Sequence, residues 1–312
     1  MSKYLVTGGA GFIGSNIAEQ LAERGHFVRV VDNLSTGKFE NIRNFIDKIE
    51  FICGDLADYK VACRAVEGMD YILHHAAIPS VQRSVDDPVS TNASIVTATV
   101  TLFKAAVESG SVKRIVQAAS SAAYGDSQGL PKREDMMPEP LSPYAAAKLA
   151  QEYYGRAFYR TYGLEVLSLR YFNVFGPRQD PGSHYSAVIP RFLSLMLQGK
   201  RPTIFGDGSA SRDFIYIDNI VEANLLACEC KWPGDALALN IGCGQGITIY
   251  ELARKLNSIM GTDLPPVFEE PRAGDILHSV ADIAKAKQIL GFQVRVGFEE
   301  GLRKLVDWFR RN

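Results

Sequence analysis

The sequence of 312 residues predicts an α/β fold, namely a Rossmann-type doubly wound parallel sheet with a smaller, segment-exchanging C-terminal α/β domain. In the first half, short apolar runs alternate with longer amphipathic ones, which is the pattern of a parallel sheet flanked by helices. The candidate strands are apolar and β-branched on both faces, as a sheet covered on both sides requires. After Arg170 this rhythm gives way to loops rich in glycine and proline.

The elements of the first half follow one another in the order that such a sheet requires. Six short β-branched runs predict strands, and amphipathic stretches long enough for several helical turns separate most of them. The expected strands are Lys3–Thr7, Phe27–Asp32, Glu50–Cys53, Tyr71–His75, Ile115–Ala119 and Val166–Arg170. The expected helices are Gly11–Arg24, Lys60–Glu67, Pro88–Ser109 and Ser142–Tyr162.

The second half predicts fewer strands and a smaller unit. The expected elements are a helix near Ile189–Gln198, a strand at Arg212–Tyr216, a strand at Ala238–Gly242, a helix at Thr248–Met260 and a terminal helix near Phe298–Arg311. We expect one domain over residues 1–173, to which segments near 212–242 return, and a second, interleaved domain over residues 174–312.

The composition excludes several classes of protein. With 34 Lys and Arg against 35 Asp and Glu, the net charge of −1 argues against a nucleic-acid binder. The apolar stretch Ala187–Leu197 is interrupted by Arg191, so no membrane segment is expected. Five scattered cysteines and a start without an export leader predict reduced thiols and a cytoplasmic location. Cys228 and Cys230 are the only close pair, the five histidines do not cluster, and no metal site is expected.

A glycine-rich segment joins the first strand to the first helix. Gly9, Gly11 and Gly14 satisfy G-x-G-x-x-G, and Gly8 adds the variant G-x-x-G-x-x-G. Such a turn lets a pyrophosphate approach the backbone at a helix N-terminus, although glycine-rich turns also form for steric reasons alone. Asp32 ends the second strand, 18 residues after Gly14 (32 − 14), where a carboxylate binds a ribose and repels a 2′-phosphate. The pattern therefore favours NAD over NADP; the alternative is that Asp32 only begins a loop.

Tyr144 and Lys148 are four residues apart and share one helix face. A tyrosine titrates near pKa ~10, and a neighbouring cation lowers that value. Ser120 and Ser121 end the fifth strand at the carboxyl edge, where ligands of open α/β sheets bind. The alternatives are an ordinary exposed Tyr–Lys pair and serines that only form a turn. Together the four residues predict a site for proton and hydride transfer beside a nicotinamide.

On these motifs the chain resembles the extended short-chain dehydrogenase/reductase family, and within it most closely the nucleotide-sugar 4-epimerases of UDP-N-acetylglucosamine and UDP-glucose. The similar segments are Thr7–Gly14, Ser120 with Tyr124-Gly125, Tyr144 to Lys148, Leu169–Gly176, Gly206–Gly208, Arg212-Asp213 and Pro271–Asp275. The resemblance implies that the first domain binds NAD and the second a UDP-sugar. It also implies a homodimer, built on a four-helix bundle of helices Pro88–Ser109 and Ser142–Tyr162.

The resemblance further implies a role for each matching residue. Tyr144 would be the acid and base at the sugar C4 hydroxyl, Lys148 would hold the nicotinamide ribose and lower the tyrosine pKa, and Ser120, helped by Ser121, would bind the C4 oxygen. The implied cofactor residues are Gly8, Gly11, Phe12, Ile13, Gly14, Asp32, Asn33, Ser35, Thr36, Gly37, Asp55, Leu56, Ala76, Ala77, Tyr144 and Lys148. The implied substrate residues are Asn173, Val188, Arg212, Arg272, Asp275 and Ser279.

Some of these positions have other interpretations. Arg212 and Asp213 could form a surface ion pair, and Asn173 could be a turn residue. One position departs from the family, which usually has Asn where this chain has Ile95. Asn92, one turn earlier, is the alternative for that cofactor contact.

The reaction is indicated by the residue after the two serines. The 4,6-dehydratases have a Thr-Asp-Glu run where this chain has Ser120-Ser121-Ala122, and the uronate decarboxylases have Glu at the position of Ala122. Because alanine cannot move a proton, we expect 4-epimerisation: hydride transfer from C4 to tightly held NAD, rotation of the 4-keto sugar, and hydride return to the opposite face.

The sugar is indicated by a single position. Seven residues after Arg272, the strict glucose/galactose epimerases have a bulky Tyr near the C2 substituent, whereas this chain has Ser279. The smaller side chain predicts UDP-N-acetylglucosamine and UDP-N-acetylgalactosamine, with UDP-glucose and UDP-galactose as a second pair. Alternatively, Ser279 only begins the last strand–helix segment. UDP-glucuronate 4-epimerase remains an alternative, since Arg178 or Arg191 could meet a carboxylate, and so does a non-catalytic NAD-binding sensor.

Overall fold

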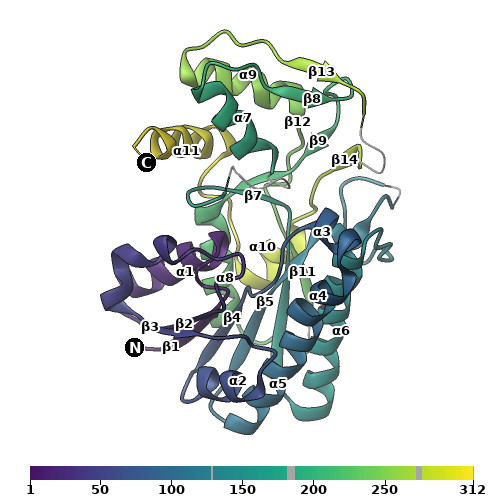
Figure 1. Cartoon of the computed structure of the whole chain (residues 1–312). Helices are drawn as coiled ribbons and strands as arrows, with labels where there is room; N and C mark the ends of the chain where they lie inside the picture. Colours follow the sequence, from purple (N-terminus) through teal and green to yellow (C-terminus); the bar gives the residue numbers. More distant parts are fainter. Residues whose placement is uncertain (128, 181–186, 236, 272–275, 312) are drawn as a thin grey trace.

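A seven-stranded, entirely parallel sheet forms the centre of the computed structural model, which describes residues 1–127, 129–180, 187–235, 237–271 and 276–311 (Figure 1). The strands lie in the order β11-β6-β5-β4-β1-β2-β3. Their bounds are β1 (Lys3–Thr7), β2 (Phe27–Asp32), β3 (Glu50–Cys53), β4 (Tyr71–His74), β5 (Arg114–Ser120), β6 (Glu165–Tyr171) and β11 (Ala238–Ile241). This arrangement confirms the predicted doubly wound α/β fold.

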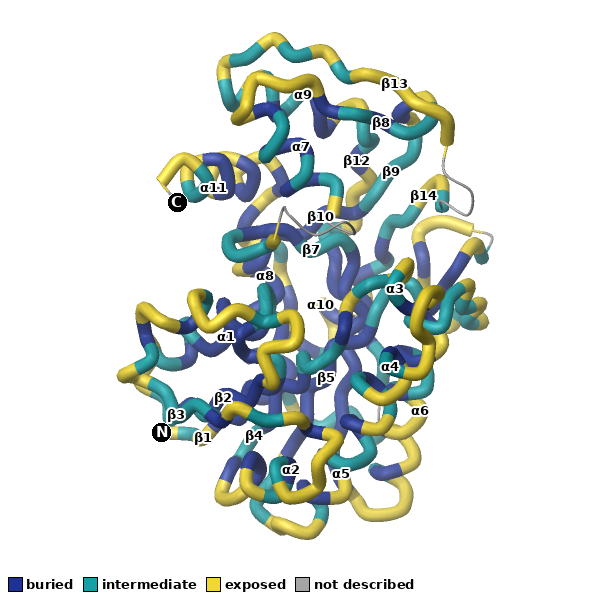
Figure 2. Tube along the Cα trace, in the orientation of Figure 1, coloured by how far each residue is buried: buried dark blue, intermediate teal, exposed yellow. Residues whose placement is uncertain are grey.

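Successive residues of each central strand point to opposite faces of the sheet, and each face has its own core. Leu5 of β1 packs with α2 (Tyr59–Val66), α5 (Ala98–Ser109) and α6 (Pro143–Tyr162). Its neighbour Val6 packs with α1 (Phe12–Glu23) and α8 (Ile217–Glu229) on the other face. Figure 2 shows the strands buried between these layers while the outer sides of the helices are exposed.

Smaller elements lie beyond the carboxyl ends of the central strands (Figure 1). They form three small sheets, β10-β7, β12-β9-β14 and β13-β8, with three helices around them. The strands are β7 (Asn173–Phe175), β8 (Thr203–Phe205), β9 (Ser211–Arg212), β10 (Phe214–Tyr216), β12 (Ile247–Thr248), β13 (Val267–Glu269) and β14 (His278–Ser279). The helices are α7 (Val188–Leu197), α9 (Ile249–Met260) and α11 (Phe298–Arg311).

Several elements differ from those expected. The single helix Pro88–Ser109 is divided into α4 (Pro88–Asn92), a π-helical turn over Ala93–Thr97, and α5. Short 3-10 turns cover Phe39–Asn41, Arg43–Lys48 and Ser121–Tyr124. Three helices were not predicted, namely α3 (Val81–Asp86), α8 and α10 (Ala284–Leu290). In the part of the chain that the structure describes, no helix is long and apolar enough to cross a membrane.

The expected strand Arg212–Tyr216 is interrupted at Asp213, which separates β9 from β10. Asp213 is fully buried, and its carboxylate accepts hydrogen bonds from the amides of Cys243 (2.7 Å), Gly244 (2.9 Å) and Ala281 (3.1 Å). Burial raises the pKa of Asp213, while these amide bonds lower it. The alternative of a surface ion pair between Arg212 and Asp213 is therefore wrong, because the carboxylate joins three segments inside the protein.

We expect Asp213→Ala to lower the free energy of unfolding by about 3 kcal/mol, because it leaves buried amide donors without an acceptor. Chemical denaturation measures the change. Asp218→Ala, which removes an exposed carboxylate 3.5 Å from Lys304, is the control and should cost less than about 1 kcal/mol. Equal losses in the two variants would contradict the assigned role of Asp213.

Candidate active site

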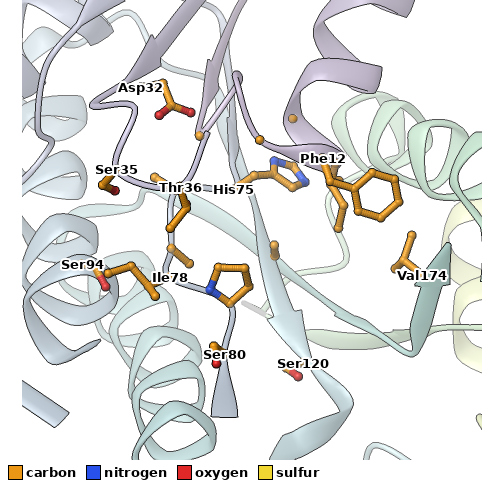
Figure 3. A pocket seen from close by; sticks show the side chains of 18 of the residues that line it. Phe12, Asp32, Ser35, Thr36, His75, Ile78, Ser80, Ser94, Ser120 and Val174 are labelled. Atoms are coloured by element: carbon orange, nitrogen blue, oxygen red, sulfur yellow. The ribbon is translucent and has the colours of Figure 1, made fainter. Parts of the chain in front are cut away.

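A cavity of about 860 Å³ opens at the carboxyl ends of β1, β2, β4, β5 and β6 (Figure 3). Asp32 and Thr36 lie on one side of it, and Ser120 and Val174 on the other. The cavity lies between β1 and β4, where the connection that leaves β1 leads to β2 on one side and the connection that leaves β4 leads to β5 on the other. Ligands of open α/β sheets bind at such a switch point.

In the glycine turn, backbone segments approach one another too closely for a side chain to fit between them. Gly8 has φ +62°, and a Cβ there would lie 2.8 Å from the backbone nitrogen of Ala76. A Cβ on Gly14 would lie 2.3 Å from the carbonyl oxygen of Gly8. Gly11 is the N-cap of α1 and offers no side-chain cap, so the N–H groups that begin the helix remain available beside the cavity. This backbone fits the binding of a pyrophosphate.

Asp32 is buried at the end of β2 and lines the same cavity. Its carboxylate accepts hydrogen bonds from the amides of Leu34 (2.8 Å) and Ala10 (3.0 Å), so the turn and the loop after β2 are joined through it. Burial raises the pKa of Asp32 and these bonds lower it. Gly37 does not line the cavity; it packs against Asp32, where a Cβ would lie 2.7 Å from a carboxylate oxygen.

The other expected cofactor residues surround the cavity. Asn33 donates to the Asp55 carboxylate at 3.0 Å, which joins the ends of β2 and β3. Phe12, Ile13, Asn33, Ser35, Thr36, Asp55, Leu56, Ala76 and Ala77 all line it. A long cavity with a glycine turn at its middle and a carboxylate at one end fits a dinucleotide.

The four expected catalytic residues line the other end of this cavity. Ser120 and Ser121 come from the end of β5, and Tyr144 and Lys148 from the first turns of α6. The Tyr144 phenol lies beside Ser120, whose side chain lowers the phenol pKa. The buried ammonium of Lys148 donates to the carbonyl of Ala118 at 2.7 Å and to Oε1 of Gln151 at 3.1 Å.

Burial has opposite effects on the pKa values of the tyrosine and the lysine. It raises the pKa of Tyr144, and the Ser120 hydrogen bond lowers it only in part. It lowers the pKa of Lys148 to about 8, while Glu152 acts in the opposite direction. The net pKa of Tyr144 is therefore raised rather than lowered as predicted, because burial of the phenol has the larger effect.

The expected substrate residues are less closely gathered. Asn173 lines the cavity, whereas Val188 lies half-buried at the start of α7, one residue from the lining Ala187. Arg212 donates to the carbonyls of Ser211 (2.9 Å) and Leu277 (3.1 Å) and pairs in register with Ser279. Neither Arg212 nor Ser279 lines the cavity. Arg272 and Asp275 lie outside the described residues.

The departure at Ile95 involves the π-helical turn. Ile95 is fully buried in that turn and Asn92 is exposed, and neither lines the cavity. Ser94 does line it, on the side of Ile78 and Ser80 (Figure 3). The polar group that this helix offers the cavity is therefore the hydroxyl of Ser94.

Sequence reasoning missed several lining residues. His75 lines the cavity, and its Nε2 is 3.1 Å from the Tyr171 hydroxyl. Burial lowers the pKa of His75 to about 4, so its ring is neutral at physiological pH. Because His75 directly precedes Ala76, an expected cofactor residue, its position in the sequence could have indicated that it lines the cavity. Arg83 reaches the cavity from the unpredicted helix α3, and no pattern in the sequence indicated it.

The fold and the cavity define an enzyme that binds a dinucleotide. The family model described as "NAD dependent epimerase/dehydratase family" matches residues 4–242. The chain belongs to the NAD-dependent epimerase/dehydratase family, which confirms the resemblance to the extended short-chain dehydrogenase/reductases, and its cofactor is NAD.

Solved structures of related proteins cover the whole chain. UDP-N-acetylglucosamine 4-epimerase from Methanobrevibacter ruminantium M1, in complex with UDP-N-acetylmuramic acid, is 39% identical with a TM-score of 0.94, covering 99% of this chain and 98% of that one. UDP-glucose 4-epimerase from Thermotoga maritima, with UDP-glucose, is 40% identical with a TM-score of 0.93, covering 99% of each chain. The complex of UDP-glucose 4-epimerase from Thermus thermophilus with NAD is 36% identical with a TM-score of 0.88, covering 99% of each chain.

Proposed function

We propose that this protein interconverts UDP-N-acetylglucosamine and UDP-N-acetylgalactosamine and accepts UDP-glucose and UDP-galactose as a second substrate pair. The broader function, NAD-dependent 4-epimerisation of a UDP-sugar, rests on the family and on relatives that are themselves named 4-epimerases of UDP-sugars. The chain is thus a nucleotide-sugar 4-epimerase, and the proposal concerns which sugar it takes and which residues act.

The reaction type is supported by one observation on the described lining of the cavity. Ser120, Tyr144 and Lys148 line it together, and β5 and α6, which carry them, contribute no carboxylate to it. Among the described residues, the carboxylates that line the cavity are Asp32, Asp55 and Asp180. They come from the ends of β2 and β3 and from the segment after β7. Elimination or decarboxylation needs a further acid near the serines, so a redox-neutral inversion at C4 is favoured.

In the proposed mechanism the protein moves one proton at the sugar O4. NAD, held by the glycine turn and Asp32, would supply the hydride acceptor and donor for C4. Tyr144 takes the O4 proton in the first half of the reaction and gives it back in the second. Ser120, which lines the cavity beside the phenol, holds O4 next to it. Lys148, with a pKa of about 8, is mostly cationic at pH 7 and favours the phenolate each time it forms.

We expect Tyr144→Phe to reduce turnover by at least about a thousandfold, because it removes the group that carries the proton. NAD should remain bound, which the absorbance of cofactor released on denaturation measures. Tyr162→Phe, at the exposed end of the same helix, is the control and should keep wild-type turnover. Wild-type turnover in Tyr144→Phe would remove this tyrosine from the mechanism.

The proposed sugar specificity rests on Ser279. This residue lies half-buried on β14, in register with Arg212 of β9. Although Ser279 does not line the described cavity, a small side chain at this position would leave volume that a tyrosine would fill and that an acetamido group at C2 would need. The Methanobrevibacter relative, named as a UDP-N-acetylglucosamine 4-epimerase, lends support to the same choice.

Proton NMR tests this choice directly. Incubated without added NAD, the wild-type protein should convert both UDP-N-acetylglucosamine and UDP-glucose, as new galacto-configured anomeric signals would report. Ser279→Tyr should lose the N-acetyl activity by at least about tenfold relative to UDP-glucose, a discrimination that steric exclusion readily supplies. Ser279→Ala keeps the position small and should retain both activities. Equal loss on both sugar pairs in Ser279→Tyr would refute this role for Ser279.

The uronate alternative depended on Arg178 and Arg191. Arg178 is paired with Glu19, and Arg191 donates to the carbonyl of Thr203 at 3.0 Å while stacking over Phe205. Arg191 does not line the cavity, and the charge of Arg178, which does line it, is already compensated by Glu19, which favours an uncharged sugar over UDP-glucuronate. The sensor alternative is disfavoured because Tyr144 and Lys148 are both present. Turnover of UDP-glucuronate alone would restore the first alternative, and NAD binding without any turnover the second.

We further propose that the enzyme is a cytoplasmic homodimer. The five cysteines are free thiols, as is usual in a reducing compartment. Val85 and Val89 from α3 and α4 and Tyr153 from α6 are exposed apolar side chains on helices that pack together. Two copies of this surface would form a four-helix bundle, because each copy would contribute the helical segment 88–109 and α6.

Sedimentation velocity of the full chain should therefore report a species of twice 34.3 kDa. Val89→Glu should shift it toward monomer, because the charge would be buried at the interface. Val267→Glu on β13, far from these helices, is the control and should leave the dimer intact. A wild-type protein that sediments as a monomer would contradict the proposed homodimer.

A further inference from the structure

The helix that carries Tyr144 and Lys148 begins with a complete set of hydrogen bonds. Ser142, the N-cap of α6, accepts the amide of Ala145 through its Oγ at 3.1 Å and the amide of Ala146 through its carbonyl at 2.9 Å. Pro143 has no N–H. One donor of the first turn is left, the amide of Tyr144 itself, and it donates to Oγ of Ser84 at 3.0 Å.

Ser84 belongs to α3 and lies 60 residues before Tyr144 in the chain. It is fully buried, and its hydroxyl donates to the carbonyl of Val81 at 2.5 Å. Because that bond commits the hydroxyl hydrogen, a lone pair of the same oxygen is directed to the Tyr144 amide. Figure 1 shows α3 and α4 beside α6, and the two short helices pack on it.

We propose that Ser84 is a positioning residue for Tyr144, which fixes the tyrosine main chain from outside α6 and so holds the phenol against Ser120. This inference rests on the proposed function of Tyr144. The oxygens of the N-cap Ser142 accept from Ala145 and Ala146, and the acceptor of the Tyr144 amide is Ser84. Without Ser84 the part-buried amide of Tyr144 loses its acceptor within the protein, and the first turn of α6 shifts to find another.

A purely structural role for Ser84 predicts a different result, and Thr91 provides the comparison. Thr91 is a buried hydroxyl residue on α4, the neighbouring helix that also packs on α6. Its Oγ1 donates to the carbonyl of Asp87 at 3.0 Å, within its own segment. Thr91→Val removes that hydroxyl at constant shape, whereas Ser84→Ala removes the acceptor of the Tyr144 amide.

The experiment compares kcat, KM and retained NAD in the two variants, with UDP-N-acetylglucosamine or UDP-glucose as substrate. Ser84→Ala should lower kcat by about tenfold or more while KM and NAD content change by less than about twofold, because misplacing a catalytic group affects the chemical step. Thr91→Val should keep kcat within about twofold of wild type. Ser84→Cys, which keeps a weak acceptor at the same position, should fall between wild type and Ser84→Ala.

Amide hydrogen exchange of the segment 142–147 gives a readout that does not need turnover. Exchange at Tyr144 should accelerate in Ser84→Ala and stay at the wild-type rate in Thr91→Val. Wild-type kcat in Ser84→Ala, an equal loss of kcat in both variants, or loss of NAD from Ser84→Ala would overturn the assignment. If the wild-type protein turns over no UDP-sugar, the proposed function fails, and unchanged exchange in Ser84→Ala would then overturn the role of Ser84 separately.

Discussion

The site depends on one constraint of the parallel sheet, the reversal of winding at β1. From β1 the chain adds β2 and β3 on one side and then β4, β5 and β6 on the other. Loops that leave neighbouring strands in opposite directions cannot cover the gap between them, so a cavity remains at their carboxyl ends. The strands on one side supply Asp32 and Asp55, and those on the other supply Ser120 and, through α6, Tyr144.

The N-termini of α1 and α6 both lie at this cavity, and they differ in whether their backbone N–H groups are bound by the protein. The first turn of α1 begins at Gly11, without a side-chain cap, so its amides remain available to an anion. In the first turn of α6, every backbone N–H donates to an oxygen of the protein. The acceptors are Ser142 and, 60 residues before Tyr144 in the chain, Ser84. The first helix can therefore bind a ligand through its backbone, whereas the second holds its side chains in place. Burial has the largest effect on the pKa values of both Tyr144 and Lys148.

The sequence predicts the part of the site that depends on local patterns. The six strands, the glycine turn, the Ser120 strand end and the Tyr144–Lys148 spacing each follow from periodicity or from a short motif, and the structure has them in the expected elements. The missed features depend on distant contacts. Helix α3 has only six residues and exposes two of its valines, so it offers no amphipathic signal for the residues that it brings to α6. Likewise the break at Asp213 is set by amides from two other segments, and the direction of the tyrosine pKa shift is set by burial.

The position of β11 has a consequence for synthesis on the ribosome. This strand completes the main sheet by pairing with β6, Ala238 opposite Ser168 and Ile241 opposite Tyr171. In the growing chain the apolar edge of β6 stays unpaired until β11 has been synthesised, which requires 67 further residues (238 − 171). At about 5–20 residues per second this interval is about 3–13 s, and an unpaired edge is prone to aggregate throughout it. The nucleotide-binding half therefore cannot finish folding as the first product of translation, and its last strand is supplied only after most of the chain has been made.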